Sequence, residues 1–101
     1  MPEHPLKFFA DNDPDLMKLV QRAADLEFSE GALSKKTKLL IALGIDTILG
    51  AAGGIRSLTE QALAAGATKE EILETLRVAH FIGGQSKLYP AAHALDGLSL
   101  P

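Results

Sequence analysis

Two polar side chains in an apolar part of the sequence could carry chemistry. Asp46 is the only charged residue after Lys38 in the stretch KKTKLLIALGIDTIL, and a lone carboxylate is costly to bury unless it is paired. Arg56 begins the next helical stretch, and a short connection could fold its guanidinium back onto Asp46. The structural interpretation is an ion pair, or a carboxylate that caps helix amides. The functional interpretation is a small polar pocket in which the arginine binds a carboxylate.

Two further polar residues, His80 and Tyr89, lie towards the C-terminus. His80 is near the end of its predicted helix, where a histidine gains from the helix dipole, but it could instead be a general base beside Asp46. The Tyr89 hydroxyl could close a pocket or satisfy a neighbouring carbonyl. Asp46, Arg56, His80 and Tyr89 are therefore candidate pocket-lining residues, with no catalytic role assigned. The histidine spacing fits no metal-binding pattern, so we expect no metal and no cofactor.

Composition limits the classes of protein to which the chain can belong. Its 101 residues fit one domain, expected here as an N-terminal arm over residues 1–12 and a single helical domain over 13–101. The net charge of −3, without a basic stripe, argues against a nucleic-acid partner. The absence of cysteine excludes disulfides, thiol redox chemistry and thiolate metal sites. No secretion signal or membrane-spanning run is visible, which predicts a cytoplasmic protein with no membrane partner.

The spacing of apolar residues predicts an all-α bundle of about five helices, since no stretch alternates with the period of two of a strand. Pro90 requires the last helix to start late or to be kinked. The start and stop signals are caps at Asp13 and Ser34, a left-handed Gly66 and a Thr-x-x-Glu capping box at Thr68. The expected helices cover about 14–28, 35–49, 53–65, 69–82 and 86–95.

The helix expected over 35–49 is apolar on nearly its whole circumference, which is typical of a helix buried on all sides. We therefore expect it to be the central helix of the bundle. Few short helices are available to surround it, and alanine-rich faces elsewhere allow close helix approach. The sequence thus predicts a homo-oligomer in which part of this apolar surface is buried between subunits.

The order of three segments, ALSKKTKLLIALGID, ALAAGATKEEILETLRVAHFIGG and AAHAL, resembles the carboxymuconolactone decarboxylase family, which includes the AhpD-like alkylhydroperoxidases. The resemblance covers about residues 32–98, and its most specific part is AGATKEEILETL. It implies a small helical bundle that assembles as a trimer, or as a hexamer built of dimers.

Redox-active members of that family carry Cys-x-x-Cys at the start of the helix that leads into the AGAT turn. A histidine follows four residues after the second cysteine, and a glutamate on the preceding helix completes a proton relay. Counting back along this sequence, the resemblance places the two cysteine positions on Ala51 and Gly54, the histidine on Leu58 and the glutamate on Leu39. All four residues are apolar here, so the thiolate chemistry of a peroxidase has no nucleophile and no relay.

Three hypotheses remain open. The first is a non-redox member of the family: an oligomer that binds a small molecule, with an anion as the candidate, in a repurposed or vestigial pocket. The second is a non-thiol lyase or decarboxylase that uses Asp46 or His80 for proton transfer. The third is a structural oligomer without a ligand. A thiol peroxidase is disfavoured because both cysteines are absent.

Overall fold

The computed structural model describes residues 6–101, so residues 1–5 of the expected N-terminal arm lie outside the described part of the chain. Residues 6–101 contain no strand, and the predicted all-α class is confirmed. No helix within them is both long and apolar enough to cross a bilayer. The helices are α1 (Lys7–Asn12), α2 (Pro14–Glu27), α3 (Lys35–Leu49), α4 (Ala52–Ala64), α5 (Lys69–Gly83) and α6 (Leu88–Leu95), with a 3-10 turn at Gln85–Lys87.

Local signals in the sequence account for where most of these helices begin and end. The side chains of Asp13 and Ser34 each accept a hydrogen bond from the backbone N–H three residues further on, at 3.2 Å and 3.1 Å. Thr68 and Glu71 form both hydrogen bonds of the predicted capping box. Gly66 has φ of 99° in the turn between α4 and α5, where a side chain would be strained.

Two terminal elements refine the prediction. The last helix begins at Leu88, which places Pro90 within its first turn, where a missing N–H is harmless. Of the two alternatives that Pro90 left for the last helix, a late start or a kink, the structure shows the late start. At the other end, the short helix α1 lies inside the segment expected to be an N-terminal arm. The rings of Phe8 and Phe9 in α1 pack edge to face on one another, and both side chains remain exposed.

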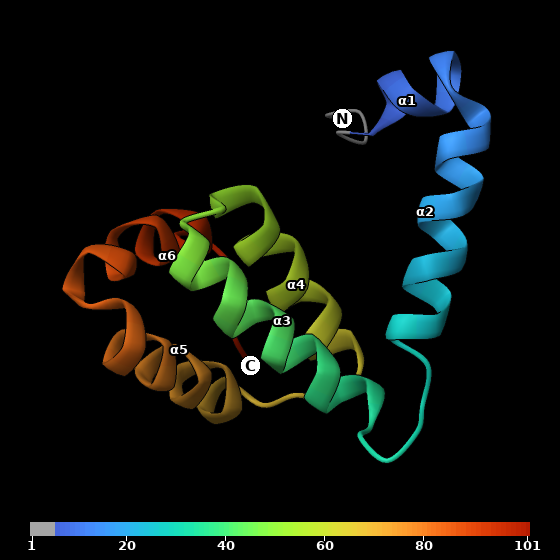
Figure 1. The fold of residues 1–101 in the computed structure, drawn as a ribbon. Helices are drawn as coiled ribbons and strands as arrows, with labels where there is room; N and C mark the ends of the chain where they lie inside the picture. Colours follow the sequence, from blue (N-terminus) through green and yellow to red (C-terminus); the bar gives the residue numbers. More distant parts are fainter. Residues whose placement is uncertain (1–5) are drawn as a thin grey trace.

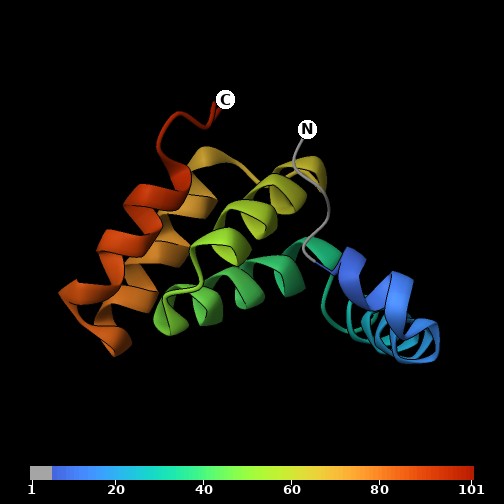
Figure 2. The same ribbon diagram turned by 90° about the horizontal axis from the view of Figure 1, so that it is seen from above.

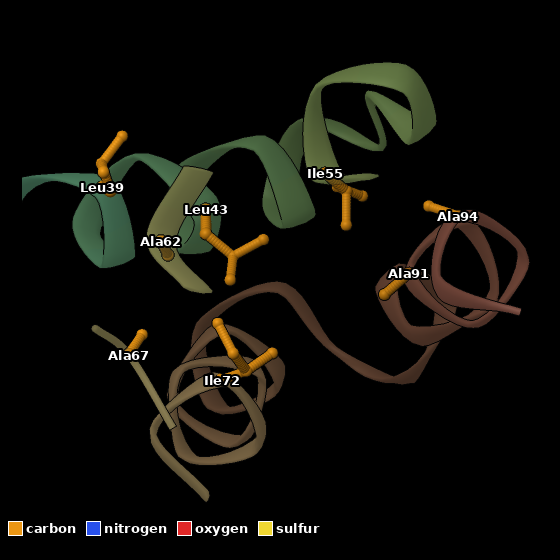
Figure 3. Packing of buried hydrophobic residues seen from close by; sticks show 8 residues of the cluster. All are labelled: Leu39, Leu43, Ile55, Ala62, Ala67, Ile72, Ala91 and Ala94. Atoms are coloured by element: carbon orange, nitrogen blue, oxygen red, sulfur yellow. The ribbon is translucent and has the colours of Figure 1, made fainter. Parts of the chain in front are cut away.

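Helices α3 to α6 form the bundle, and α1 and α2 project from it as a separate helical arm (Figure 1). Within the bundle α3 packs against both α4 and α5, while α4 also packs against α6. The view from above shows the same separation of the arm from the bundle (Figure 2). The core lies where these helices meet and is built from small and medium aliphatic side chains (Figure 3), namely Leu39, Leu43, Ile55, Ala62, Ala67, Ile72, Ala91 and Ala94.

The central position of α3 is confirmed, but α3 is not buried on all sides within one chain. Leu39, Leu43 and Thr47 face the core and are fully buried. Ile45 keeps 54% and Leu49 70% of its surface exposed. The reason is that α4 and α5 cover only part of the circumference of α3, and α2 leaves the remainder open.

Candidate functional site

The glycine- and alanine-rich run after α3 forms a tight turn that starts α4. Gly50 ends α3 in the left-handed conformation with φ of 73°, and this explains the need for glycine there. The N–H of Ala51 donates to the carbonyl oxygen of Asp46 at 3.1 Å, and the N–H of Ile55 donates to the carbonyl of Ala51 at 2.8 Å. The two helices are therefore joined almost directly, and the Asp46 side chain is brought to the first turn of α4.

Asp46 is half-buried and lies against the backbone of Gly54. A Cβ added at position 54 would collide with Asp46 Oδ2 and come within 3.1 Å of Asp46 Cγ, whereas one at Gly53 would meet nothing within 4 Å. Gly54 is thus small because the carboxylate occupies the space that a side chain would need. Glycine is therefore needed at the two positions for different reasons. Gly50 adopts a left-handed backbone conformation, and Gly54 leaves space for the Asp46 carboxylate.

Arg56 does not meet Asp46. Its Nη1 donates to the carbonyl oxygens of Ala94 at 3.1 Å and Asp96 at 3.4 Å, and its Nε lies 3.5 Å from Glu60 Oε1. Arg56 therefore ties α4 to the C-terminal end of α6, where unpaired carbonyls favour a cation. No ion pair or side-chain hydrogen bond of Asp46 occurs within residues 6–101, so the expected pairing of these two residues is absent from the described chain.

Of the four positions at which the resemblance places redox residues, two belong to the core and two lie at the start of α4. Leu39 is buried in the core cluster, and Leu58 packs against that cluster (Figure 3 shows Leu39). Ala51 is the residue before α4, and Gly54 lies in its first turn. None of these four side chains could donate or accept a proton, but the titratable carboxylate of Asp46 lies against Gly54 in the first turn of α4.

A second place for chemistry is a pocket of about 390 Å³ between α5 and α6. Leu73, Leu76 and Leu88 supply its apolar wall, and Arg77 and His80 supply its polar groups. The α5 residues are three or four positions apart, so they share one side of that helix. Neither Arg77 nor His80 makes an ion pair or a side-chain hydrogen bond within the described residues. The arrangement is a leucine-walled pocket with two basic side chains.

The four candidate residues do not all line the α5–α6 pocket. His80 lines the α5–α6 pocket, whereas Asp46, Arg56 and Tyr89 do not, and Tyr89 is 70% exposed. Within residues 6–101 no group of three or more histidine, aspartate or glutamate side chains is placed to hold a metal ion.

Sequence reasoning overlooked two residues. Arg77 stands three positions before His80, and this helical spacing was the signal that could have found it. The second is Thr59, whose hydroxyl is fully buried and has no partner among the described residues. No sequence signal distinguishes it from Thr47, which is also buried but donates to the Leu43 carbonyl at 2.8 Å.

One titratable group links the starts of two helices. Glu71 accepts the backbone N–H of Thr68 at 2.9 Å, and its carboxylate lies 3.0 Å from the ammonium group of Lys36 on α3. The hydrogen bond from the Thr68 backbone, followed by the one from Lys36, holds the pKa of Glu71 below its usual value. This interaction orients α5 relative to α3, and α5 carries both basic groups of the pocket.

Comparison with known proteins gives the affiliation of the chain. Residues 14–97 match the carboxymuconolactone decarboxylase family. A crystal structure of an apo carboxymuconolactone decarboxylase family protein from Legionella pneumophila superposes with a TM-score of 0.84 at 37% identity, covering 90% of this chain and 81% of that one. A Paracoccus denitrificans protein, described as an uncharacterized 15.0 kDa protein in the nqo9-nqo10 intergenic region, is 44% identical over 59 residues. That match covers 56% of this chain and only 44% of the Paracoccus protein. The chain therefore belongs to the carboxymuconolactone decarboxylase family.

Proposed function

We propose that this family member has no thiol peroxidase activity and binds a small organic carboxylate in the α5–α6 pocket. The observation that carries the proposal is the pairing of Arg77 and His80 with three leucines in one pocket. A guanidinium can donate two parallel hydrogen bonds to a carboxylate, and leucine walls accept the hydrocarbon part of the same molecule. Because both basic side chains lack partners within residues 6–101, a ligand carboxylate would not have to displace an existing ion pair.

Calorimetric titration with hexanoate and benzoate tests this assignment, with hexanol and benzyl alcohol as uncharged counterparts. We expect both carboxylates to bind more tightly than the alcohols. Removing a charge-assisted hydrogen bond costs about 1.5–3 kcal/mol, so Arg77→Gln should weaken binding by roughly tenfold or more. Lys69→Gln is the control, because Lys69 lies at the start of α5 outside the pocket and is likewise without an ion pair among the described residues. Equal weakening by the two substitutions, or equal binding of acid and alcohol, would refute the proposal.

A second candidate function, a non-thiol lyase or decarboxylase, is favoured by one observation. The Asp46 carboxylate lies against Gly54 at the start of α4, where the resemblance places a reactive cysteine. A carboxylate there could transfer a proton to or from a bound lactone. Decarboxylation of a lactone by the wild-type protein, lost in Asp46→Asn with the melting temperature preserved, would support this candidate. Activity that persists in Asp46→Asn would remove it.

We also infer that the working form is a homo-oligomer. Seventeen large hydrophobic side chains among the described residues are exposed, whereas the fully buried core contains only four large aliphatic ones, Leu39, Leu43, Ile55 and Ile72. A soluble monomer rarely leaves so much apolar surface in contact with water. Association of identical chains would cover it symmetrically. Light scattering tests this inference, and a well-behaved monomer at high concentration would contradict it. If the oligomer forms but no small molecule binds, the protein is a structural oligomer.

A further inference from the structure

Helix α2 carries a row of apolar side chains on the side away from its own bundle. The side towards the bundle is mixed, since Gln21, Ala24 and Asp25 all line one cleft at its surface. Leu16 lies nine positions before Asp25, which puts it on the opposite side of a helix that turns about 100° per residue. The apolar stripe on that opposite side consists of Leu16, Leu19, Val20 and Leu26, and Leu26 is 76% exposed. Leu19 is also more than half exposed, whereas Leu16 and Val20 are partly covered.

A second uncovered apolar surface is the groove between α3 and α5, with a volume of about 360 Å³. Its floor is a close approach of the two helices, because a Cβ added at Gly44 would lie 3.6 Å from Thr75 Cγ2. Its walls are aliphatic and consist of Leu40, Ile41, Ile45, Ile48, Val78 and Ile82. This groove is the part of the α3 circumference that α4 and α5 leave open.

We propose that the α2 stripe of a second copy of this chain occupies the α3–α5 groove. This proposal deepens the homo-oligomer inferred above and rests on it. The lengths agree, since the stripe from Leu16 to Leu26 spans about 15 Å and the α3 wall from Thr37 to Ile48 spans about 17 Å at 1.5 Å per residue. An amphipathic helix in an apolar groove is also a recurrent mode of protein association.

Charge complementarity supports the same occupant and sets its direction. Lys18, Arg22 and Leu26 follow one another at four-residue spacing along α2, at one edge of the apolar stripe. Glu70, Glu74 and Val78 have the same spacing on α5 and end at the groove wall. The four charged residues form no ion pair within residues 6–101. A parallel arrangement of the two helices places Lys18 beside Glu70, Arg22 beside Glu74 and Leu26 beside Val78.

Charge reversal with mixing tests the pairing. The variants Lys18→Glu/Arg22→Glu and Glu70→Lys/Glu74→Lys each place like charges opposite one another in their own oligomer. We expect each variant alone to associate roughly tenfold more weakly than wild type, because every interface loses two opposite-charge pairs and gains two like-charge pairs. Mixing the two variants in equal amounts should restore association, because both interfaces of a mixed dimer then carry opposite charges. Sedimentation over a dilution series measures the association.

A matched control separates pairing from net charge. Lys69→Glu/Lys87→Glu changes the net charge as much as Lys18→Glu/Arg22→Glu does, but neither residue lies in the groove or on the α2 stripe. It should leave association close to wild type. Melting curves by circular dichroism confirm that each variant is folded. If mixing fails to restore association between folded variants, the proposed pairing is wrong even when the oligomer itself persists.

The absence of native cysteine permits a second, positional test. Mixing Leu26→Cys protein with Val78→Cys protein under mild oxidation should give a covalent dimer. Leu49→Cys replaces Val78→Cys in the control, since Leu49 is equally exposed but does not line the groove. Equal yields for the two mixtures would overturn the proposal. A disulfide formed inside one chain that carries both Leu26→Cys and Val78→Cys would overturn it too, by showing that α2 covers its own groove. A monomeric wild type refutes the oligomer itself.

Discussion

The position of the Asp46 carboxylate against the first turn of α4 predicts that alanine has opposite effects on stability at Gly53 and at Gly54. Replacing glycine by alanine inside a helix normally stabilises a protein by about 0.5–1 kcal/mol, because glycine is the more flexible in the unfolded chain. Gly53→Ala should show this gain, since its new methyl group meets nothing within 4 Å. At Gly54 the methyl group would collide with Asp46 Oδ2, so the carboxylate must leave its position.

The stability cost of Gly54→Ala follows from the displacement of the Asp46 side chain. Forcing a side chain off its rotamer costs about 0.5–1.5 kcal/mol, and overpacking costs about 1–3 kcal/mol in total. After subtraction of the helix gain, Gly54→Ala should destabilise the protein by about 1–2 kcal/mol. The two alanine variants should then differ by about 2 kcal/mol, or roughly 10 °C in melting temperature for a domain of this size.

Thermal and urea unfolding at one protein concentration measure the contrast, because association also changes apparent stability. Asp46→Ala provides the internal check, since removing the carboxylate removes the collision. Gly54→Ala should therefore cost much less in the Asp46→Ala background than in wild type, and a double-mutant cycle measures the difference. Equal stability of Gly53→Ala and Gly54→Ala in wild type would refute the reasoning, as would an undiminished cost in the Asp46→Ala background.

Three further predictions concern other parts of the chain. Thr59→Val should stabilise the protein by about 1 kcal/mol, because it removes a buried hydroxyl that has no partner among the described residues. Thr47→Val should not stabilise the protein, because it removes a hydroxyl that donates a hydrogen bond. Equal effects of the two substitutions in urea unfolding would contradict this reasoning. The pKa of Glu71 is lower in the folded protein than in the unfolded chain, where it is about 4.3. The ionised carboxylate therefore stabilises the fold fully above that unfolded-state pKa, and this contribution is lost as the pH falls through the lower folded-state pKa. Wild type should therefore exceed Glu71→Gln in stability near neutral pH and lose that advantage in acid, and a pH-independent difference would exclude the mechanism. Peroxide turnover with a thiol reductant should stay at the buffer background, and turnover that co-purifies with the protein would contradict the absence of redox chemistry.

The helices were predictable because their determinants are local. Caps such as Asp13, Ser34 and Thr68 act within three residues, and the structure contains all of their hydrogen bonds. The six residues of α1 have no apolar period to reveal them, and the 3-10 turn before α6 is equally short. The exposure of Ile45 was not predictable from periodicity either, because periodicity shows that a surface is apolar but not which element covers it.

The candidate site depended on tertiary contacts, and the sequence predicted it less well. An apolar stretch identified Asp46 as unusual, but the contact with Gly54 arises only from the tight turn at Gly50. Arg56 lies close to Asp46 in sequence, yet it turns to the carbonyls at the end of α6, some 40 residues away. A long flexible side chain can reach several partners, and the sequence separation does not show which of them it will contact.

The most direct test of the proposed function is an amide NMR titration of the wild-type protein with hexanoate. Binding in the α5–α6 pocket predicts that the largest shift changes fall on Leu73, Arg77, His80 and Leu88, and that they disappear in Arg77→Gln. Hexanol should produce much smaller changes at the same concentration. Changes centred on the start of α4, or no saturable change at all, would contradict a carboxylate site between α5 and α6.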